Sequence, residues 1–402
     1  MKICIYFESS PREGGAFHEN INLMKVFNEY NKSEFDFTYI VSSHEIKVIL
    51  EKYGCKTIFL KKNIFFRMHQ FLFKFIFFRY LYKKLNIKNA YEKFIFKNKF
   101  DLSLFNSPSE ISMLASNLPF IIILFEFQHR TDNYLPEYTG FHDFNLRELI
   151  IDHATKRAFK VLVATNKDKE VVKKLYNAND KNIKIQPYVP FLPDIYENNK
   201  DKIDYKLIFD ELSIKSKKFL FYPAQFWPHK NHKYIIDAID LAVNNCKDDM
   251  HVVFSGYDKG NLEYIKNQIK SKNIENNVKI FNYLSNDQII SLYLNSTALV
   301  MPTFVGHSTL PLYEAFYFKL PVFFTEDLLD EKLKDLVYEV NLFKPQDLFE
   351  KYKLLDDDKN KENKISSASK FYNNNCSREQ LFNNFKDIFK EYKYLKSRWS
   401  EI

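Results

Sequence analysis

Short runs of apolar residues alternate with longer amphipathic stretches along the first half of the chain. The runs are rich in Ile, Val, Phe and Tyr, and they lie at 2–7, 35–41, 100–105, 119–125 and 160–165. Between them, apolar residues recur at helical spacing, for example over 17–29 and 167–176. Buried strands separated by amphipathic helices predict a parallel sheet that is covered by helices on both faces.

The alternation is interrupted once and then restarts. Residues 186–217 contain three prolines followed by charged and polar residues, which is typical of a linker between domains. Further apolar runs lie at 219–222, 251–256, 278–284, 297–302 and 321–325. A chain of 402 residues is long for a single hydrophobic core. We therefore predict two Rossmann-like domains with doubly wound parallel sheets, 1–190 and 218–376, facing across a cleft and joined by a linker at 191–217.

The last stretch of the chain has a pattern of its own. Residues 377–396 carry an apolar stripe at helical spacing, with Ser377 as a candidate N-cap. This pattern predicts a C-terminal helix within 377–402 that packs back on the domains.

Composition narrows the class of protein. There are 59 Lys and Arg against 51 Asp and Glu, a net charge of +8 that favours anionic partners. Aromatic residues are frequent along the whole chain, so they do not indicate a nucleic-acid surface. The four cysteines include no Cys-x-x-Cys pair, which argues against a zinc knuckle and a disulfide framework and fits a reducing cytoplasm. The N-terminus lacks the pattern of a signal peptide, and no apolar run is long enough to span a membrane.

Two transitions from strand to helix carry candidate chemistry. The first, FLFYPAQFWPHKNH at 219–232, brings Lys230 to the start of a helix, where backbone N–H groups and a positive charge suit a phosphate or diphosphate. A surface loop with an exposed lysine is the alternative. The second, at 297–325, places a polar loop before a helix that starts near Pro311 and has Glu314 in its first turn. That carboxylate could accept hydrogen bonds from a ribose diol, or it could simply complement the helix dipole.

Together, PAQFWPHKNH and PTFVGHSTLPLYEAF resemble the donor half of the retaining glycosyltransferases of family 4, which have the GT-B fold. The segments 160–190 and 126–138 are similar to the end of that family's N-terminal domain and to a loop on the acceptor side of its cleft. Gly14 and Gly15 match its glycine-rich loop. The resemblance therefore extends over both halves of the chain.

The resemblance implies roles for individual residues. Lys230 would bind the donor diphosphate, while Gln225 replaces the arginine of the family's R-x4-K pair. Glu314 would bind the ribose hydroxyls, while Gly306 replaces the first Glu of its E-x7-E motif. His129 matches a histidine near the donor sugar, so Lys230, Glu314 and His129 are the candidate catalytic residues. The remaining donor-binding candidates are Gly256, Tyr283 and Leu284, at the ends of two other predicted strands, and His307, Ser308, Thr309 and Leu310, which follow Gly306.

The resemblance also implies the reaction. A sugar would move from a nucleoside diphosphate sugar to a glycan or a lipid-linked acceptor with retention of configuration, in the assembly of a bacterial surface polysaccharide such as lipopolysaccharide, O-antigen or capsule. It implies no cofactor and no metal. The only Asp-x-Asp match is Asp356-Asp357-Asp358, which follows a helical stretch and is a poor candidate for a metal site.

Residues 61–84 suggest a further partner. The segment contains seven Lys and Arg residues among many Phe, and it has no acidic residue. This composition suits an interfacial helix on an anionic membrane surface, with Arg67, Lys74 and Arg79 as candidate contacts. A helix buried in the first domain, with its lysines reaching solvent, is the alternative. We predict a cytoplasmic protein, peripheral at the inner face of the cell membrane.

Two other functions remain open at the level of sequence. A non-catalytic partner that binds a nucleotide sugar would fit the replacements at Gln225 and Gly306. A sugar-nucleotide epimerase of the GT-B fold would use the same donor half but needs acid and base carboxylates in the cleft. A glycosidase is disfavoured, because no flanking pair of carboxylates is recognisable.

Overall fold

The computed structural model describes residues 1–9, 15–31, 33–115, 117–125, 127–216, 218–307, 309–326 and 328–398, without the side chains of 15, 16, 141 and 142. These residues form two compact units. The first unit comprises 1–129, 140–187 and 378–402, and the second comprises 130–139 and 188–377.

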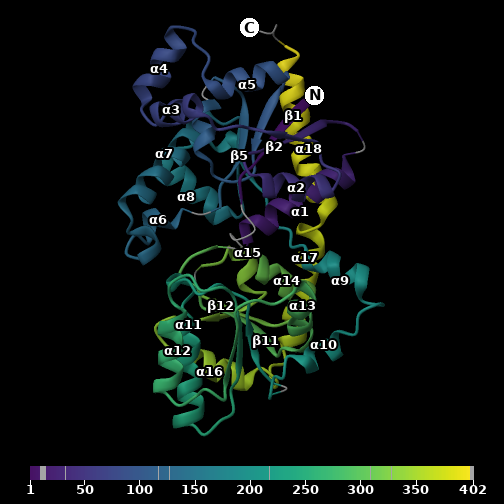
Figure 1. The fold of residues 1–402 in the computed structure, drawn as a ribbon. Helices are drawn as coiled ribbons and strands as arrows, with labels where there is room; N and C mark the ends of the chain where they lie inside the picture. Colours follow the sequence, from purple (N-terminus) through teal and green to yellow (C-terminus); the bar gives the residue numbers. More distant parts are fainter. Residues whose placement is uncertain are drawn as a thin grey trace. The chain divides into compact units, whose positions relative to one another are not determined.

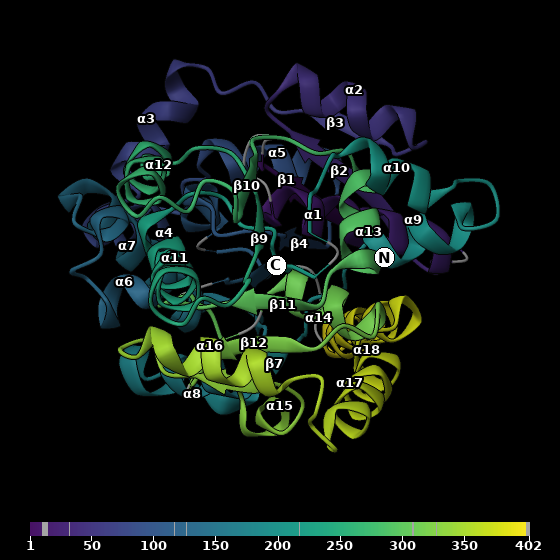
Figure 2. The ribbon, with the colours of Figure 1, turned by 90° about the horizontal axis from the view of Figure 1, so that it is seen from below.

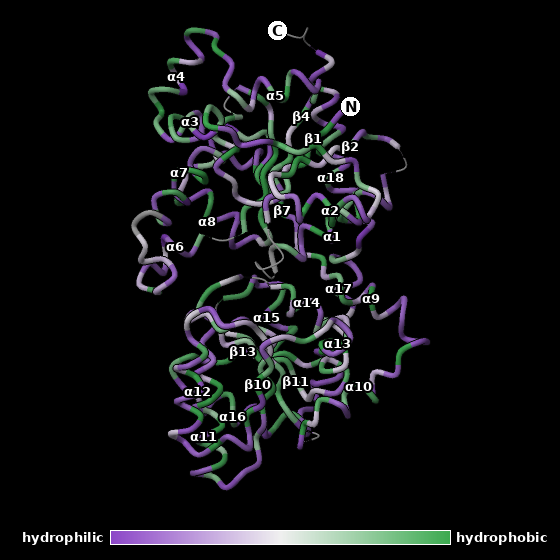
Figure 3. Tube along the Cα trace, in the orientation of Figure 1, coloured by the Kyte–Doolittle hydropathy of each residue, from purple (hydrophilic) through white to green (hydrophobic). Residues whose placement is uncertain are grey.

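The first unit is built on a seven-stranded sheet in which every strand pairing is parallel. Its order is β3-β2-β1-β4-β5-β6-β7. The strands are β1 (Lys2–Phe7), β2 (Asp36–Val41), β3 (Thr57–Phe59), β4 (Leu102–Phe105), β5 (Phe120–Ile123), β6 (Lys160–Val163) and β7 (Ile183–Ile185). The strands are mostly buried and apolar (Figure 3), which is the pattern of a sheet with both faces covered.

Helices cover both faces of this sheet. Figure 1 shows α1, α2 and α18 on one face and α7 and α8 on the other. The helices of the unit are α1 (Gly15–Tyr30), α2 (His44–Lys52), α3 (Ile64–Leu72), α4 (Ile76–Lys84), α5 (Ala90–Asn98), α6 (Gln128–Thr131, which runs into the second unit), α7 (Phe141–Arg157), α8 (Asn166–Tyr176) and α18 (Arg378–Lys396). Helix α18 packs on α1 through Phe385 and Phe389, whose rings lie 5.1 and 6.1 Å from that of Phe27.

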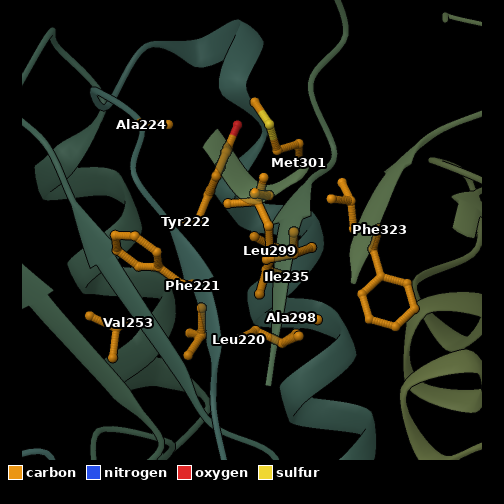
Figure 4. Close-up of a cluster of buried hydrophobic side chains, with 14 of the residues drawn as sticks. Leu220, Phe221, Tyr222, Ala224, Ile235, Val253, Ala298, Leu299, Met301 and Phe323 are labelled. Carbon is orange, nitrogen blue, oxygen red and sulfur yellow. The ribbon is translucent and has the colours of Figure 1, made fainter. Parts of the chain in front are cut away.

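The second unit repeats the same plan with six parallel strands in the order β10-β9-β8-β11-β12-β13. The strands are β8 (Leu220–Tyr222), β9 (Val252–Ser255), β10 (Val278–Phe281), β11 (Ala298–Met301), β12 (Val322–Thr325) and β13 (Tyr338–Val340). Side chains of β8, β9, β11 and β12 pack with Ile235 of the following helix in a buried core (Figure 4). In both sheets the strand order reverses beside the first strand of the unit.

The helices of the second unit also form two layers. Figures 1 and 2 show α11, α12 and α16 on one face of the sheet, and α10, α13, α14 and α17 on the other. Their bounds are α9 (Leu192–Asn199), α10 (Tyr205–Glu211), α11 (His232–Asp240), α12 (Leu262–Ser271), α13 (Asn286–Asn295), α14 (Leu310–Tyr317), α15 (Glu331–Lys334), α16 (Pro345–Leu354) and α17 (Lys361–Asn375). No helix in the described ranges is both long and apolar enough to cross a membrane.

The stretch at 191–217 is not the irregular linker that its prolines and charges predict. It contains α9 and α10, and both helices belong to the second unit. Leu192 and Tyr205 are buried in the core of that unit, and Ser291 of α13 donates a hydrogen bond to the carbonyl oxygen of Tyr205. The few apolar side chains among the charges therefore decide the structure here.

The basic segment at 61–84 forms two helices, α3 and α4, instead of one. The break at residues 73–75 is held from inside by Arg79, whose guanidinium donates to the carbonyl oxygens of Phe73 and Lys74 and to Nδ1 of His153, at 3.0 Å. His153 Nε2 lies 3.2 Å from the carbonyl oxygen of Ser112, so this nitrogen carries the proton. Burial, and then the nearby Arg79, lower the pKa of His153 to about 3, which keeps the ring neutral. Lys74 also faces inward and pairs with Glu110 at 3.3 Å.

This arrangement bears on the three cations predicted to contact a membrane. Arg79 and Lys74 are half-buried and make contacts within the first unit, whereas Arg67 is exposed. Their contact with a membrane stays a prediction.

Replacing Arg79 with Ala should destabilise the first unit. The substitution leaves two backbone carbonyl groups and His153 without their donor, and hydrogen bonds to a charged group contribute about 1.5–3 kcal/mol. We expect the free energy of unfolding, measured by urea denaturation with circular dichroism, to fall by about 2 kcal/mol. Arg67→Ala, at an exposed position, serves as the control. Equal unfolding midpoints for the two variants would contradict the role assigned to Arg79.

Candidate functional site

The reversal of strand order in the second sheet lies between β8 and β11. In a parallel sheet of this kind the loops at the carboxyl ends of the two strands diverge, and ligands bind where they separate. The loop after β8 leads to α11, and the loop after β11 leads to α14. Both transitions singled out in the sequence therefore lie side by side at the same edge of one sheet.

The loop after β8 ends in a short 3₁₀ turn, Pro228–Lys230, followed by Asn231 in a left-handed conformation with φ of 52°. The hydroxyl of Tyr222, at the end of β8, donates to the carbonyl oxygen of Lys230 at 2.8 Å. Lys230 is half-buried, directly before the N-terminus of α11. The turn thus brings a cation to a helix start, where the partial positive charge of the N-terminus also lies.

The second loop is fastened to the first through the carbonyl oxygen of His229. That oxygen accepts a hydrogen bond from the backbone N–H of Phe304, at 2.9 Å. The hydroxyl of Thr303 lies 3.2 Å from the same oxygen and 2.8 Å from the carbonyl oxygen of Val305, and it can donate its one proton to either. Thr325 of β12 donates to the carbonyl oxygen of Thr303 at 2.7 Å. The two loops and the neighbouring strand end therefore form one connected hydrogen-bonded edge.

Glu314 is buried beneath this edge. Its side chain accepts a hydrogen bond of 2.7 Å from the hydroxyl of Tyr293 in α13. Burial raises the pKa of Glu314 to about 7, and the hydrogen bond from Tyr293 partly opposes this rise. Glu314 is the fifth residue of α14, which corrects its predicted place in the first turn. Complementing the dipole at the N-terminus is therefore not its role, because that effect is confined to the first turn.

The loop before α14 departs from the resembled motif for a structural reason. Gly306 has a φ of 101°, in the region that favours glycine, so a Glu at this position would be strained. His307 and Leu310 are half-buried, and Thr309 caps α14 by accepting a hydrogen bond from the N–H of Leu312. Ser308 lies outside the described residues.

The remaining donor-side candidates lie at the ends of neighbouring strands. Gly256 follows β9, and a Cβ atom there would lie 2.3 Å from the carbonyl oxygen of Ala224, so the position requires glycine. Gln225 accepts a hydrogen bond of 3.2 Å from the indole of Trp227. After β10, Tyr283 is exposed and its ring lies 6.0 Å from that of Tyr257, whereas Leu284 is buried.

Glu137 was missed by the sequence analysis. Its Oε1 accepts hydrogen bonds from the backbone N–H of His229, at 2.9 Å, and from the ring Nδ1 of His229, at 2.5 Å. Leu135 and Tyr138 form a small buried cluster with Val305, next to Gly306. The segment 130–139 thus packs on both loops of the second unit. The partners are 92 positions apart, and no local pattern indicates the pairing.

His229 and His232 have different surroundings, although they are only three positions apart. His232 is fully buried at the start of α11, with its ring stacked on that of Phe226 at 4.4 Å and edge-to-face with that of Phe254 at 5.0 Å. Burial lowers the pKa of His232 to about 3, so the ring is neutral. Of the two histidines in PHKNH, His229 belongs to the site, and His232 belongs to the core beneath it.

Two of the candidate residues in the first unit, His129 and Gly15, lie among the described residues. His129 is buried in α6 rather than solvated, and its Nε2 donates to Glu148 at 2.7 Å, while the hydroxyl of Tyr176 donates to the same carboxylate oxygen at 2.6 Å. Gly15 is the first residue of α1, and Gly14 lies outside the described residues. The proximity of His129 to a donor sugar stays a prediction.

Two of the aspartates at 356–358 form ion pairs or hydrogen bonds within the second unit. Asp356 pairs with Lys218 at 2.7 Å and with Lys361 at 3.4 Å, and Asp358 accepts a hydrogen bond from the hydroxyl of Tyr338. Among the residues described, His, Cys, Asp and Glu side chains do not gather in any group of three that could hold a metal ion.

Comparisons with known proteins agree with this geometry. Residues 204–370 match the family model described as glycosyl transferases group 1. Three solved structures share the fold. HepE of Anabaena, in complex with UDP and glucose, is 14% identical with a TM-score of 0.71, and the match covers 97% of this chain and 100% of that one. A glycosyltransferase of Rickettsia africae is 14% identical with a TM-score of 0.70, and sucrose-phosphate synthase of Thermosynechococcus elongatus is 11% identical with a TM-score of 0.68; each match covers 97% of this chain and 98% of the other. The comparison with curated protein sequences finds no match. The chain has the two-domain, Rossmann-like GT-B fold.

Replacing His232 with Phe should reduce the acid sensitivity of the second unit. The unfolded histidine binds a proton near pH 6.5 and the folded one only near pH 3, so stability falls as the pH decreases through this window, by about 1.4 kcal/mol per pH unit. Phe keeps the stacked ring and removes the titration. Between pH 7.5 and 5.0, urea denaturation should show a loss about 2 kcal/mol smaller for His232→Phe than for the wild type.

The exposed His44 provides the control, because His44→Phe makes the same aromatic exchange away from the core. It should leave the acid-induced loss of stability unchanged. If His232→Phe loses as much stability in acid as the wild type, the burial of a neutral histidine is not responsible.

Proposed function

We propose that the protein is a glycosyltransferase that transfers a sugar from a nucleoside diphosphate sugar to a glycan or a lipid-linked acceptor with retention of configuration. The observation that carries the proposal is the connected edge at the reversal of strand order, where Lys230, the start of α11 and the buried Glu314 occur together. The family model that matches 204–370 covers this edge. HepE, which shares the fold, binds UDP and glucose.

Each of these groups has a role that its chemistry suits. Lys230 and the helix N-termini would stabilise the negative charge of the diphosphate as the bond to the sugar breaks. Glu314 would accept hydrogen bonds from the ribose hydroxyls, and such bonds favour its ionised form. The acceptor hydroxyl would attack the anomeric carbon from the face that the diphosphate leaves. The diphosphate would depart with the bonding electron pair, and one of its oxygens would take the proton of the acceptor.

The proposed setting is the assembly of a bacterial surface polysaccharide, with the protein acting in the cytoplasm and peripheral at the inner face of the cell membrane. The exposed cations and apolar side chains of α3 and α4 support the peripheral location. A hexose donor and a mechanism that needs no metal are part of the proposal, and both come from the resemblance to family 4.

A second function has a specific observation in its favour. Gln225 stands where the resembled motif has an arginine, and its side-chain oxygen accepts a hydrogen bond from Trp227. Gly306 stands where the motif has a Glu, at a backbone conformation that favours glycine. A non-catalytic partner that binds the nucleotide sugar would tolerate both changes. A sugar-nucleotide epimerase is the third possible function, and it would invert a carbon centre of the donor sugar without any acceptor. Product analysis with and without acceptor separates the three.

Lys230→Ala and Glu314→Ala should each weaken nucleotide binding and lower turnover at least about tenfold, or roughly 1.4 kcal/mol. A nucleotide at 100 times its dissociation constant adds about 2.7 kcal/mol of stability, which thermal denaturation resolves. UDP, GDP, ADP and CDP are compared on the wild type to choose the base, and the variants are then tested with that nucleotide.

Lys266→Ala and Glu263→Ala, both exposed on α12, are the matched controls. They should behave like the wild type. Full stabilisation and full activity in either site variant would remove the site assignment. Binding without turnover in the wild type would favour the non-catalytic partner.

The pH dependence of binding offers a separate check on Glu314. Because its pKa is about 7 in the unliganded protein, most of the carboxyl is protonated at pH 6 and most is ionised at pH 8. If the ionised form binds the ribose, affinity should rise about tenfold between these pH values. In Glu314→Gln the increase in affinity that comes from ionising Glu314 should disappear. The nucleotide itself titrates equally in both experiments, so the ratio of wild-type to variant affinity at each pH reports the effect of Glu314 alone. A parallel pH profile in both proteins would mean that Glu314 does not contact the ligand in its ionised form.

A further inference from the structure

Helices α3 and α4 expose an unusual amount of apolar surface. Eight apolar side chains define what we call the α3–α4 face: Ile64, Phe65, Met68, Phe71, Phe75, Ile76, Phe77 and Tyr80. Ile76 and Ile64 are 79% and 74% exposed. The structure describes every residue of α4, and none of them is buried. Contiguous apolar patches of this kind on a protein surface mark interaction sites.

Cations flank the apolar residues at both ends of the segment. Lys61 and Arg67 lie before and within α3, Lys83 and Lys84 end α4, and all four are exposed. The sequence from 61 to 88 contains no Asp or Glu. Neighbouring carboxylates are already paired within the first unit, because Glu8 binds Lys62 at 2.9 Å, Glu110 binds Lys74 and Asp152 binds Lys156 at 2.5 Å. The charge that this face presents is therefore positive.

The inward cations explain why the apolar side chains point outward. Arg79 joins the break at 73–75 to His153 of α7, and Lys74 joins it to Glu110. Phe66 and Phe73 are buried in the core, and Leu72 and Tyr82 pack against it. With these side chains and the polar anchors directed inward, Phe65, Phe71, Phe75 and Phe77 are left exposed. The exposure thus results from a built arrangement of buried contacts.

We propose that the α3–α4 face docks the protein on an anionic lipid bilayer. Amphipathic helices of this composition lie in the interface, with Phe and Ile among the acyl chains and Lys and Arg at the headgroups. A protein partner fits less well, because lysine is depleted in protein interfaces, whereas here lysines border the apolar residues at both ends. The proposal rests on the peripheral location given under the proposed function and names the surface and the lipid charge that would produce it. The surface requires no donor or acceptor sugar, so lipid binding can be measured independently of glycosyl transfer.

Vesicle flotation tests the proposal with the full-length protein. Vesicles of phosphatidylcholine alone are compared with vesicles that also contain phosphatidylglycerol. We expect binding to the anionic vesicles, weaker binding to the neutral ones, and a decrease with salt as headgroup attraction is screened. Ile76→Ser/Phe77→Ser should weaken binding at least about tenfold, because two exposed apolar anchors are lost.

Charge is tested by Lys83→Glu/Lys84→Glu, which should weaken binding to anionic vesicles at least about tenfold and binding to neutral vesicles much less. The control is Lys390→Glu/Lys393→Glu, which makes the same change in net charge at two exposed lysines of α18. Phe343→Ser, at a residue of the second unit that is 91% exposed, controls for the loss of an apolar side chain. All these positions are exposed, so thermal unfolding should stay unchanged.

Three outcomes would overturn the proposal. Lys390→Glu/Lys393→Glu could weaken vesicle binding as much as Lys83→Glu/Lys84→Glu, and the loss of binding would then depend on net charge and not on the α3–α4 face. The serine variant could bind vesicles like the wild type. The wild type could fail to bind vesicles but self-associate, as measured by light scattering, and Ile76→Ser/Phe77→Ser could abolish the self-association. The α3–α4 face would then bind a second copy of the chain. Loss of vesicle binding with unchanged turnover on a soluble acceptor separates this proposal from the proposed function.

Discussion

The hydrogen bonds of His229 hold the candidate site together. Reversal of strand order separates the loops after β8 and β11, and without a further contact each loop would be fixed only at its own strand and helix. The N–H of Phe304 donates to the carbonyl oxygen of His229, the hydroxyl of Thr303 lies 3.2 Å from that oxygen, and Glu137 accepts from the N–H and the ring of the same residue. The turn that carries Lys230 is thereby fixed from two sides. A cation at a helix start is useful for binding a diphosphate only if it is held in place.

The departures from the resembled motifs are compatible with this frame. Gly306 allows the loop after β11 to take a left-handed turn, and Val305 beside it packs against Leu135 and Tyr138. A long acidic side chain at 306 would strain that turn. The segment 130–139 brings a different carboxylate, Glu137, to the loop after β8. The candidate site therefore differs from the resembled motifs in its charged residues, and the structure accommodates both replacements.

The sequence predicts the architecture well, because a buried parallel strand and an amphipathic helix each have a local pattern. All strands predicted in both halves are present, and the two strand-to-helix transitions meet at one edge. The failures involve contacts that local patterns do not contain. Glu137 and His229 are far apart in sequence, and the inward direction of Arg79 depends on a break in a segment that reads as one helix. Residues 191–217 look like a linker because their few core side chains, such as Leu192 and Tyr205, are outnumbered by charges. His232 lies in the same motif as Lys230 and is a core residue, since the pattern does not show which side of a turn is buried.

The burial of Glu314 is hard to explain by folding alone. A carboxyl group whose pKa rises from 4.5 to about 7 stabilises the folded state below its unfolded pKa, and this contribution is lost as the pH rises through 7. Above that pH the ionised group costs roughly 3 kcal/mol relative to the unfolded chain. Its position in the second turn of α14 gives it no compensating interaction with the helix dipole, and Tyr293 offsets only part of the cost. Hydrogen bonds from a ligand's hydroxyl groups would lower this cost, so the same burial that destabilises the empty site increases the free energy that binding can contribute. A hydrophobic residue at 314 would suit the core better, and the carboxylate is understandable if it is there for the ligand.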